Sequence, residues 1–169
     1  MMTNFNDQLI ELVNQDSDQQ LIFDCVSEIL RDQVGYKLFT ILGFQNSRRM
    51  VSRLYSSDPV NFPVGGFKAL GSTEWGAIVL QKGEVLIAKN KGDLRRIFPD
   101  HTLLLNMGLG SAVNIPIKYA GQVHAMLNML DVEGFYNSRS VHKAERVAEL
   151  LGPVLAAEKK VKFYDCARE

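Results

Sequence analysis

The chain has 169 residues, of which 46% are hydrophobic and 22% charged, and its 19 lysines and arginines balance its 19 aspartates and glutamates. A chain of this length and composition folds as one globular domain and buries a core without needing disulfides or metals. The zero net charge argues against non-specific nucleic-acid binding, and no apolar run approaches the roughly 18 residues of a membrane span.

Two amphipathic helices are predicted at the N-terminus. The first lies within residues 1–16, and the second runs from Ser17 to about Val34, where apolar residues recur on one face. Ser17, with Gln20 three residues later, forms a capping-box pattern, and Gly35 ends the helix. The first residues lack the basic and apolar regions of a signal peptide, so we expect a cytoplasmic protein.

The hydrophobic period then changes to that of strands. Lys37–Phe44 and Arg49–Ser56 are joined by Gln45–Arg48, which predicts a β-hairpin. The first of these strands is apolar on both faces, so we expect it to be buried on both sides, with a second sheet face on which a pocket can form. Asp58–Gly71 is predicted to be a loop, because it contains two prolines and three glycines.

The middle of the chain reads as short helices and one short strand. A helix is predicted over Thr73–Lys82 with Ser72 as its cap, and a strand over Val85–Ala88. Gly92–Met107 is predicted to hold two brief helical turns that Pro99 separates.

The longest β signal lies near the C-terminus. Two half-apolar runs, Ser111–Lys118 and Gln122–Asp131, flank the turn Tyr119–Gln122, which predicts a long β-hairpin. Direct hairpins, without long crossover connections between strands, predict an α+β fold with an antiparallel sheet.

A final helix is predicted to start at Ser138 or Ser140, with a kink at Gly152-Pro153. Beyond that point the apolar side chains of residues 158–166 have nothing left in the domain to cover. We therefore expect this extension and the first helix to pack against a second copy in a two-fold homodimer. The predicted organisation is an N-terminal helix over 1–16 that contributes to the dimer, a central domain over 17–157 and a C-terminal helical extension over 158–169.

This order of elements, from about Ser17 to Ala157, resembles the GAF domain. The segments that carry the resemblance are Leu38–Leu42, Gly108–Ser111, Asn114–Ile117, Gly121–Val123 and Leu127–Leu130. The chain resembles in particular short stand-alone bacterial GAF proteins, in which Tyr55–Pro59 leads into Pro63–Gly66 and a tryptophan-bearing helix.

The resemblance implies a profilin-like, PAS-related sheet of five or six antiparallel strands with helices on both faces. The N- and C-terminal helices would cover one face. The segments between the second strand and the long hairpin would cover the other, with a small-molecule pocket beneath them. Relatives bind cyclic nucleotides, bilins, haem or small metabolites, and many dimerise through terminal helices.

Departures from the family pattern narrow the ligand. Asn128 is followed by Met129 rather than the lysine of cyclic-nucleotide-binding members, and Ser138-Arg139 stand where those members have acidic residues. Neither Cys25 nor Cys166 is placed to hold a bilin. We therefore expect no cyclic nucleotide and no bilin. We also expect no metal, because the histidines lack ligand spacing and no Cys-x-x-Cys is present.

Four polar or aromatic residues within the strands are candidate ligand contacts. Arg53 and Tyr55 alternate onto one face of the second strand, where the planar guanidinium suits a carboxylate or phosphate, although it could equally be an exposed arginine at a sheet edge. Asn114 and Asn128 interrupt apolar strands. Because burying an unpaired amide costs about 1–3 kcal/mol, each is expected to have a partner, either backbone or ligand.

Three further candidates lie in the covering segments and in the long hairpin. Trp75 begins the helix expected to wall the pocket, where it could serve the core, the ligand or both. Lys68 lies in a glycine-flanked loop, where it could contact a ligand or be solvated. His124, in the middle of the hairpin, could donate to a ligand or be a hydrogen-bonded core histidine.

No catalytic constellation is found. Cys25 falls on an apolar helix face as a small core residue, and no Cys-x-x-Cys is present. The three histidines lack ligand spacing, and no nucleophile with a positioned base appears.

The favoured interpretation is a non-catalytic small-molecule sensor or regulatory domain. Ligand binding is expected to order Asp58–Gly71 and Lys89–Phe98 and so to change the activity of a downstream regulatory protein. One alternative is an enzyme like the free methionine-(R)-sulfoxide reductases, which use cysteines around the pocket that this chain lacks. The other is a protein-interaction scaffold with a vestigial pocket.

Overall fold

The computed structural model of the chain describes residues 5–15 and 17–157. The predicted C-terminal extension over 158–169 lies outside the described residues. The elements in chain order are α1 (Phe5–Asn14), α2 (Gln19–Gln33), β1 (Leu38–Gln45), the 3-10 turn η1 (Asn46–Arg48), β2 (Met50–Ser56), β3 (Gly65–Ala69), the π-helix η2 (Gly76–Gln81), β4 (Leu86–Ala88), α3 (Lys91–Ile97), α4 (His101–Asn106), β5 (Ser111–Tyr119), β6 (Gln122–Asp131) and α5 (Ser138–Ala156).

The strands form one six-stranded antiparallel sheet in the order β3-β2-β1-β6-β5-β4. The long hairpin β5–β6 is confirmed. Its two-residue turn has Ala120 at φ 49° and Gly121 at φ 76°. Two left-handed residues match the twist of the flanking strands, which is why a short turn can close this hairpin. The predicted α+β fold with an antiparallel sheet is therefore confirmed.

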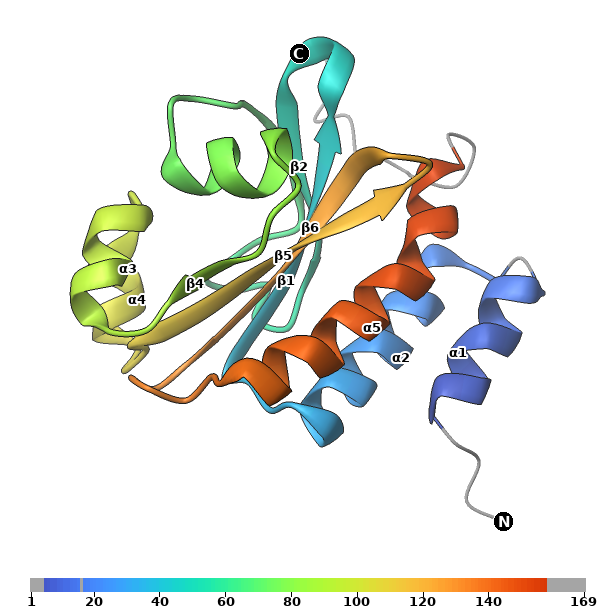
Figure 1. Cartoon of the computed structure of the whole chain (residues 1–169), viewed down its shortest axis with the longest axis horizontal. Helices are drawn as coiled ribbons and strands as arrows, with labels where there is room; N and C mark the ends of the chain where they lie inside the picture. Colours follow the sequence, from blue (N-terminus) through green and yellow to red (C-terminus); the bar gives the residue numbers. More distant parts are fainter. Residues whose placement is uncertain (1–4, 16, 158–169) are drawn as a thin grey trace.

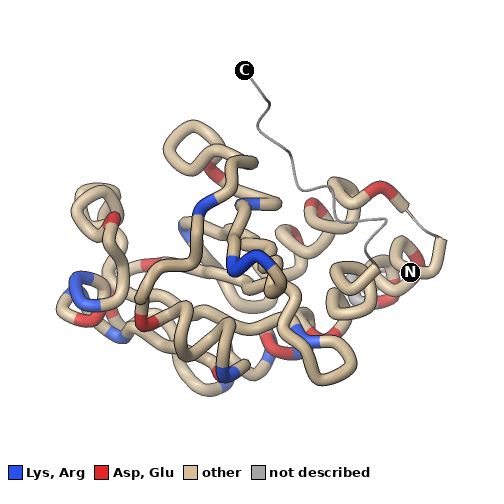
Figure 2. The backbone as a smooth tube through the Cα atoms, turned by 90° about the horizontal axis from the view of Figure 1, so that it is seen from above, with Lys and Arg blue, Asp and Glu red and all other residues tan. Residues whose placement is uncertain are grey.

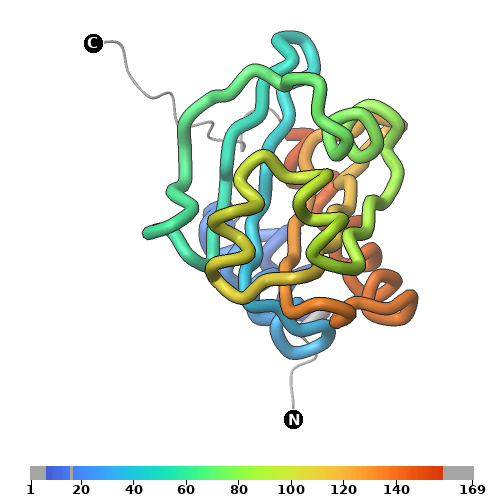
Figure 3. The backbone as a smooth tube through the Cα atoms, turned by 90° about the vertical axis from the view of Figure 1, so that its left-hand side faces the viewer, coloured from blue at the N-terminus to red at the C-terminus, as the bar shows by residue number. Residues whose placement is uncertain are grey.

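Helices cover both faces of the sheet (Figure 1). Alternate strand residues such as Phe39, Ile41 and Leu127 pack with α2 and α5 in one apolar cluster, and α1 joins it through the fully buried Leu9. Figure 3 shows the other face, where η2, α3 and α4 lie over the sheet. A second apolar cluster, including Leu38 and Met126, lies beneath them. The two-sided covering expected from the apolar first strand is thus confirmed.

Basic residues are spread over several elements rather than gathered on one (Figure 2). Within the described residues, no helix is both long and apolar enough to cross a bilayer.

The prediction that Asp58–Gly71 is a loop is only partly right, because the segment contains β3. This edge strand pairs with β2 through Met50 opposite Ala69 and Val51 opposite Lys68. Its glycine content hides it from sequence patterns, since glycine is depleted in strands. Likewise Lys89–Phe98, expected to be a segment that a ligand orders, already contains α3, capped by the Asn90 side chain.

Three helix caps differ from the predictions. The Asp18 carboxylate, rather than Ser17, caps α2 by accepting from the Gln20 N–H at 2.8 Å. Thr73 Oγ1, rather than Ser72, accepts from the Gly76 N–H at 3.2 Å. The side chain of Asn137, one residue before Ser138, caps α5 in a capping box with Ser140. The three predictions are wrong for the same reason, which is that several adjacent residues could each have capped the same helix.

The predicted helix over Thr73–Lys82 is mostly a π-helix. The Lys82 N–H donates to the Ala77 carbonyl five residues earlier, at 3.1 Å. A Cβ at Gly76 would lie 2.8 Å from the Leu70 side chain, so glycine lets the segment lie close to its neighbour. Because π-turns are uncommon and gather at functional sites, this wall of the second face is a place to look for function.

We expect Tyr136 to lower stability at high pH. Its hydroxyl donates to the Gly35 carbonyl at 3.4 Å, and burial, with Asp131 nearby, raises the pKa of Tyr136 well above its usual value. Above about pH 10 the unfolded chain therefore loses a proton that the folded chain keeps, and the free energy of unfolding falls by up to about 1.4 kcal/mol per pH unit.

Urea unfolding of the wild type and of Tyr136→Phe at pH 8 and pH 11 measures this effect. Tyr136→Phe should lose less stability between the two pH values than the wild type. Tyr119→Phe, at an exposed tyrosine, should behave as the wild type. Equal pH dependence in all three proteins would show that Tyr136 ionises freely in the folded state.

Candidate functional site

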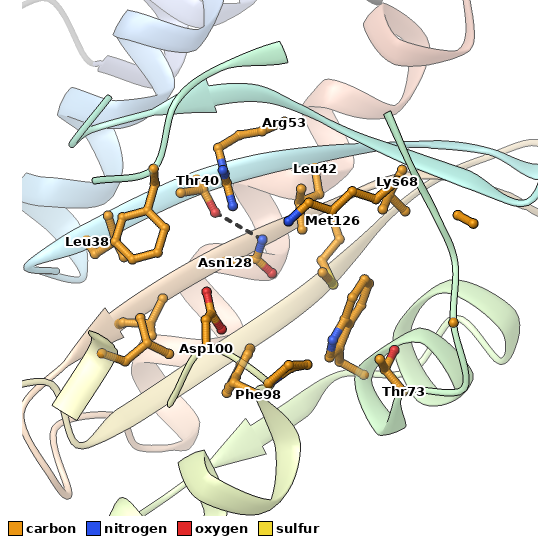
Figure 4. Close-up of a pocket in the computed structure, with 18 residues that line it drawn as sticks. Leu38, Thr40, Leu42, Arg53, Lys68, Thr73, Phe98, Asp100, Met126 and Asn128 are labelled. Carbon is orange, nitrogen blue, oxygen red and sulfur yellow. Dashed lines mark hydrogen bonds between the residues drawn. The ribbon is translucent and has the colours of Figure 1, made fainter. Parts of the chain in front are cut away.

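A cavity of about 380 Å³ lies on the second face of the sheet, between β1, β2, β3 and β6 and the segments that cover them. Its sheet side is apolar, with Leu38, Leu42, Met126 and Leu130, and Phe98 faces them from the covering segment (Figure 4). A few polar side chains project among these apolar ones. They are Thr40, Arg53, Lys68, Thr73, Asp100 and Asn128.

Arg53 lines this cavity and Tyr55 does not, because β2 carries a β-bulge between them. Arg53 lies opposite Leu42 and Tyr55 lies opposite Ile41, so the intervening Leu54 is an extra residue in β2. A bulge shifts the alternation of side chains by one position. The prediction that Arg53 and Tyr55 share one face is therefore wrong.

Tyr55 belongs instead to the apolar cluster on the helix side of the sheet. Its ring lies 6.1 Å from the ring of Phe23 and 5.5 Å from that of Phe39, measured between centroids. Tyr55 therefore contributes to the core and does not line the cavity.

Arg53 is a half-buried cation that no described carboxylate pairs. Its Nη1 donates to the Pro63 carbonyl at 3.1 Å, and its guanidinium lies 5.5 Å from the centroid of the Phe62 ring. Nε is buried without a hydrogen-bond partner. Burial lowers the pKa of Arg53, and the more distant Asp100 partly offsets this. An orphaned donor on a desolvated guanidinium favours an anionic or carbonyl-bearing group in the cavity.

Asn128 lies at the floor of the cavity, and one of the two polar atoms of its side chain has no hydrogen-bond partner. Its Nδ2 donates to Thr40 Oγ1 at 3.1 Å, so its partner is a side chain of the neighbouring strand. Its Oδ1 has no hydrogen-bond partner, and because the residue is only 5% exposed, solvent does not supply one. A buried acceptor at the cavity floor favours a group that donates a hydrogen bond.

Asn114 lies directly opposite Asn128 on β5, but it does not line the cavity. It is fully buried, and neither its Oδ1 nor its Nδ2 has a hydrogen-bond partner in the described protein. The sequence predicts that Asn114 has a backbone or ligand partner, and the described protein supplies none.

Of the three remaining predicted site residues, two line the cavity and one does not. Lys68, on β3, and Trp75, at the start of η2, both line the cavity. His124 does not, because it lies at a bulge of β6 near the turn of the long hairpin. The cavity extends over β1, β2 and β6 rather than along the hairpin towards its turn, so His124 lies outside it.

Asp100 is a cavity residue that the sequence analysis missed. It occupies the position before α4, where an aspartate normally caps the helix, yet its side chain makes no capping hydrogen bond. The carboxylate instead points into the cavity from the side opposite Arg53 (Figure 4). Thr40 was also missed, and its signal was a polar residue within an otherwise apolar strand.

The described residues offer no cluster of three or more histidine, cysteine, aspartate or glutamate side chains that could hold a metal ion. Cys25 is buried in the cluster on the opposite face of the sheet, and burial, with Glu28 nearby, raises the pKa of its thiol. A raised pKa keeps a thiol in its unreactive protonated form. Cysteine chemistry at the cavity, as in the reductase alternative, has no support from Cys25.

Several solved structures have the same fold. The GAF domain of the Acinetobacter phosphoenolpyruvate-protein phosphotransferase superposes with a TM-score of 0.72 at 15% identity, over 97% of this chain and 100% of that one. A GAF domain/HD domain protein from Geobacter sulfurreducens gives 0.70 at 14% identity, over 86% and 97%. The GAF domain of a two-component sensor histidine kinase from Bacillus halodurans gives 0.68 at 13%, over 80% and 92%.

Comparisons of the sequence found no family model and no curated protein that matches the chain. At such low identities the structural likeness establishes the fold alone.

Proposed function

Because this chain has the fold of GAF domains, we propose that it is a sensory or regulatory domain that binds, in the cavity and without catalysis, a small molecule with an anionic or amide group. The observation that carries the proposal is Arg53, a half-buried residue that lines the cavity, has a buried Nε without a hydrogen-bond partner and forms no ion pair with a described carboxylate. A neighbour in fold is a domain of a sensor histidine kinase, which supports a regulatory role.

The size and lining of the cavity support a small metabolite. Ligand pockets span roughly 300–1,000 Å³, so about 380 Å³ lies near the lower end of that range. Apolar walls with a few convergent polar groups are typical of sites that bind by burial and orient by hydrogen bonds.

Regulation would follow from the covering segments. Residues 58–64, β3 and the segment 71–75 that leads into η2 border the cavity. A ligand that contacts them in one arrangement more strongly than in another shifts the population between the two. A downstream regulatory protein and a homodimer remain predictions from the sequence.

A thermal-shift screen of metabolites tests the proposal. A compound present at about 100 times its Kd stabilises the folded state by about 2.7 kcal/mol, which for a domain of this size raises Tm by roughly 5–10 °C. We expect at least one compound to do so with the wild type.

Two arginine variants locate the effect. Arg53→Gln should lose most of the rise in Tm, whereas Arg48→Gln, an exposed arginine in η1, should keep it. The proposal fails if no compound raises Tm, or if Arg53→Gln responds as strongly as the wild type.

A further inference from the structure

Charges of opposite sign face one another across the cavity. Arg53 on β2 and Lys68 on β3 project from one side, and Asp100 projects from the segment before α4 on the other (Figure 4). None of the three forms an ion pair with another described residue. They are therefore charged groups arranged around the same space without being neutralised by contact.

A ligand of a single charge would leave one side of this arrangement opposed. An anion alone would meet the guanidinium of Arg53 favourably but would also face the carboxylate of Asp100, and a simple cation would have the converse problem. Guanidinium and ammonium groups only donate hydrogen bonds, whereas an ionised carboxylate only accepts them. The complementary ligand therefore carries both an anionic acceptor and a cationic donor.

Asn128 supplies a second, independent sign of a donor on the ligand. Its Oδ1 is buried and unpartnered at the floor of the cavity, while its Nδ2 is occupied by Thr40. In Figure 4 the Asn128 side chain lies between those of Arg53 and Asp100. An ammonium group placed beside Asp100 could donate to both oxygen acceptors, and a neighbouring carboxylate could reach the guanidinium.

Most of the remaining lining is apolar, with leucines, a methionine and two phenylalanines among its walls. We propose, building on the function proposed above, that the cavity takes an α-amino acid with an apolar side chain. Its carboxylate binds Arg53 and Lys68, its ammonium binds Asp100 and Asn128 Oδ1, and its side chain lies against Leu42, Met126 and Leu130.

Matched ligands test this assignment by calorimetry on the full chain. The panel is leucine, isoleucine, valine, methionine and phenylalanine, and the tightest of them is compared with its analogue lacking the amino group and its analogue lacking the carboxylate. For leucine these are 4-methylpentanoate and 3-methylbutylamine. We expect the amino acid to bind at least about tenfold more tightly than either analogue, because each analogue leaves one charged side of the cavity unmatched.

Variants assign each ligand group to its side chain. Asp100→Asn should weaken binding of the amino acid about tenfold or more, whereas the deaminated carboxylate should bind no more weakly than before, because the variant removes a charge that opposes it. Arg53→Gln should weaken both carboxylate-bearing compounds, whereas the amine should bind no more weakly than before, because the variant removes a positive charge that opposes it. Asp32→Asn, at an exposed aspartate of α2, is the matched control and should change neither Kd.

Two results would overturn the assignment. One is that no amino acid of the panel binds, and the other is that the deaminated analogue binds as tightly as its parent and responds equally to Asp100→Asn. Either result leaves the proposed sensory function standing if another metabolite stabilises the wild type and not Arg53→Gln. That function fails only if the screen finds no such compound.

Discussion

Gly152→Ala is expected to destabilise the protein by about 3 kcal/mol, at the upper end of the usual cost of overpacking. Gly152 is buried in α5 where this helix crosses β5. A Cβ at this position would lie 2.3 Å from the carbonyl oxygen of Lys118 and 3.3 Å from its carbonyl carbon. Both atoms belong to the backbone of β5, so no side chain can rotate away, and the helix or the hairpin has to move.

The sign of this effect is informative because helix propensity alone predicts the opposite. Alanine is favoured over glycine by about 1 kcal/mol in the interior of a helix, so a loosely packed α5 would gain stability from the change. The contact matters beyond α5, since Lys118 also donates from Nζ to the Gly83 carbonyl at 3.0 Å, just after η2. Displacing β5 here would therefore disturb the end of η2 as well, and η2 follows the cavity-lining Trp75.

Urea unfolding of the wild type, Gly152→Ala and Gly71→Ala measures the cost. Gly71 has no atom within 4 Å of an added Cβ and no positive φ, so Gly71→Ala should be neutral or gain up to about 1 kcal/mol from a less flexible unfolded chain. If Gly152→Ala proved as stable as Gly71→Ala, α5 could not lie as close to β5 as described.

Asn114→Leu is expected to stabilise the protein by about 1–2 kcal/mol. Asn114 is fully buried and does not line the cavity. Both polar atoms of its amide lack partners among the described residues. Its neighbours on this face include the apolar Leu86, directly opposite on β4, and Asn128 on β6. Leucine has nearly the same shape and removes the desolvation penalty of an unpaired amide.

The matched control is Asn106→Leu, at an exposed asparagine that ends α4. This change should lie within about 0.5 kcal/mol of the wild type, because surface substitutions away from special contacts have small effects. Melting temperatures and urea midpoints of both variants decide the matter. A loss of stability in Asn114→Leu would mean that the amide is hydrogen-bonded in solution.

The regular elements could largely be predicted from the sequence, because apolar periodicity and turn residues are local. The long hairpin is the best case, since its strands alternate and a left-handed pair, Ala120 and Gly121, closes it. The edge strand β3 was missed because pairing with β2, rather than local propensity, makes Gly65–Ala69 extended.

The site was only partly predictable, because its membership depends on register. Arg53, Lys68, Trp75 and Asn128 line the cavity as expected. Tyr55 does not, since a bulge that no local pattern announces turns it to the opposite face.

Two further differences have other physical causes. Asn114 shares the face of Asn128, but the cavity ends between them, and the extent of a cavity depends on how distant segments cover the sheet. Asp100 was hidden by its position at a helix start, where an aspartate is expected to cap rather than to face a ligand.

The most direct test of the central claim, that the cavity beside β1, β2 and β6 is where this protein binds its ligand, is a nuclear magnetic resonance titration with the metabolite that raises Tm most. Trp75 is the single tryptophan of the chain and lines the cavity, so its indole N–H gives one resolved reporter. We predict the largest shifts at this signal, at the Asn128 side-chain amide and at the Arg53 Nε–H. Unmoved signals there, with shifts gathered instead on α1, α2 and α5 across the sheet, would contradict the account.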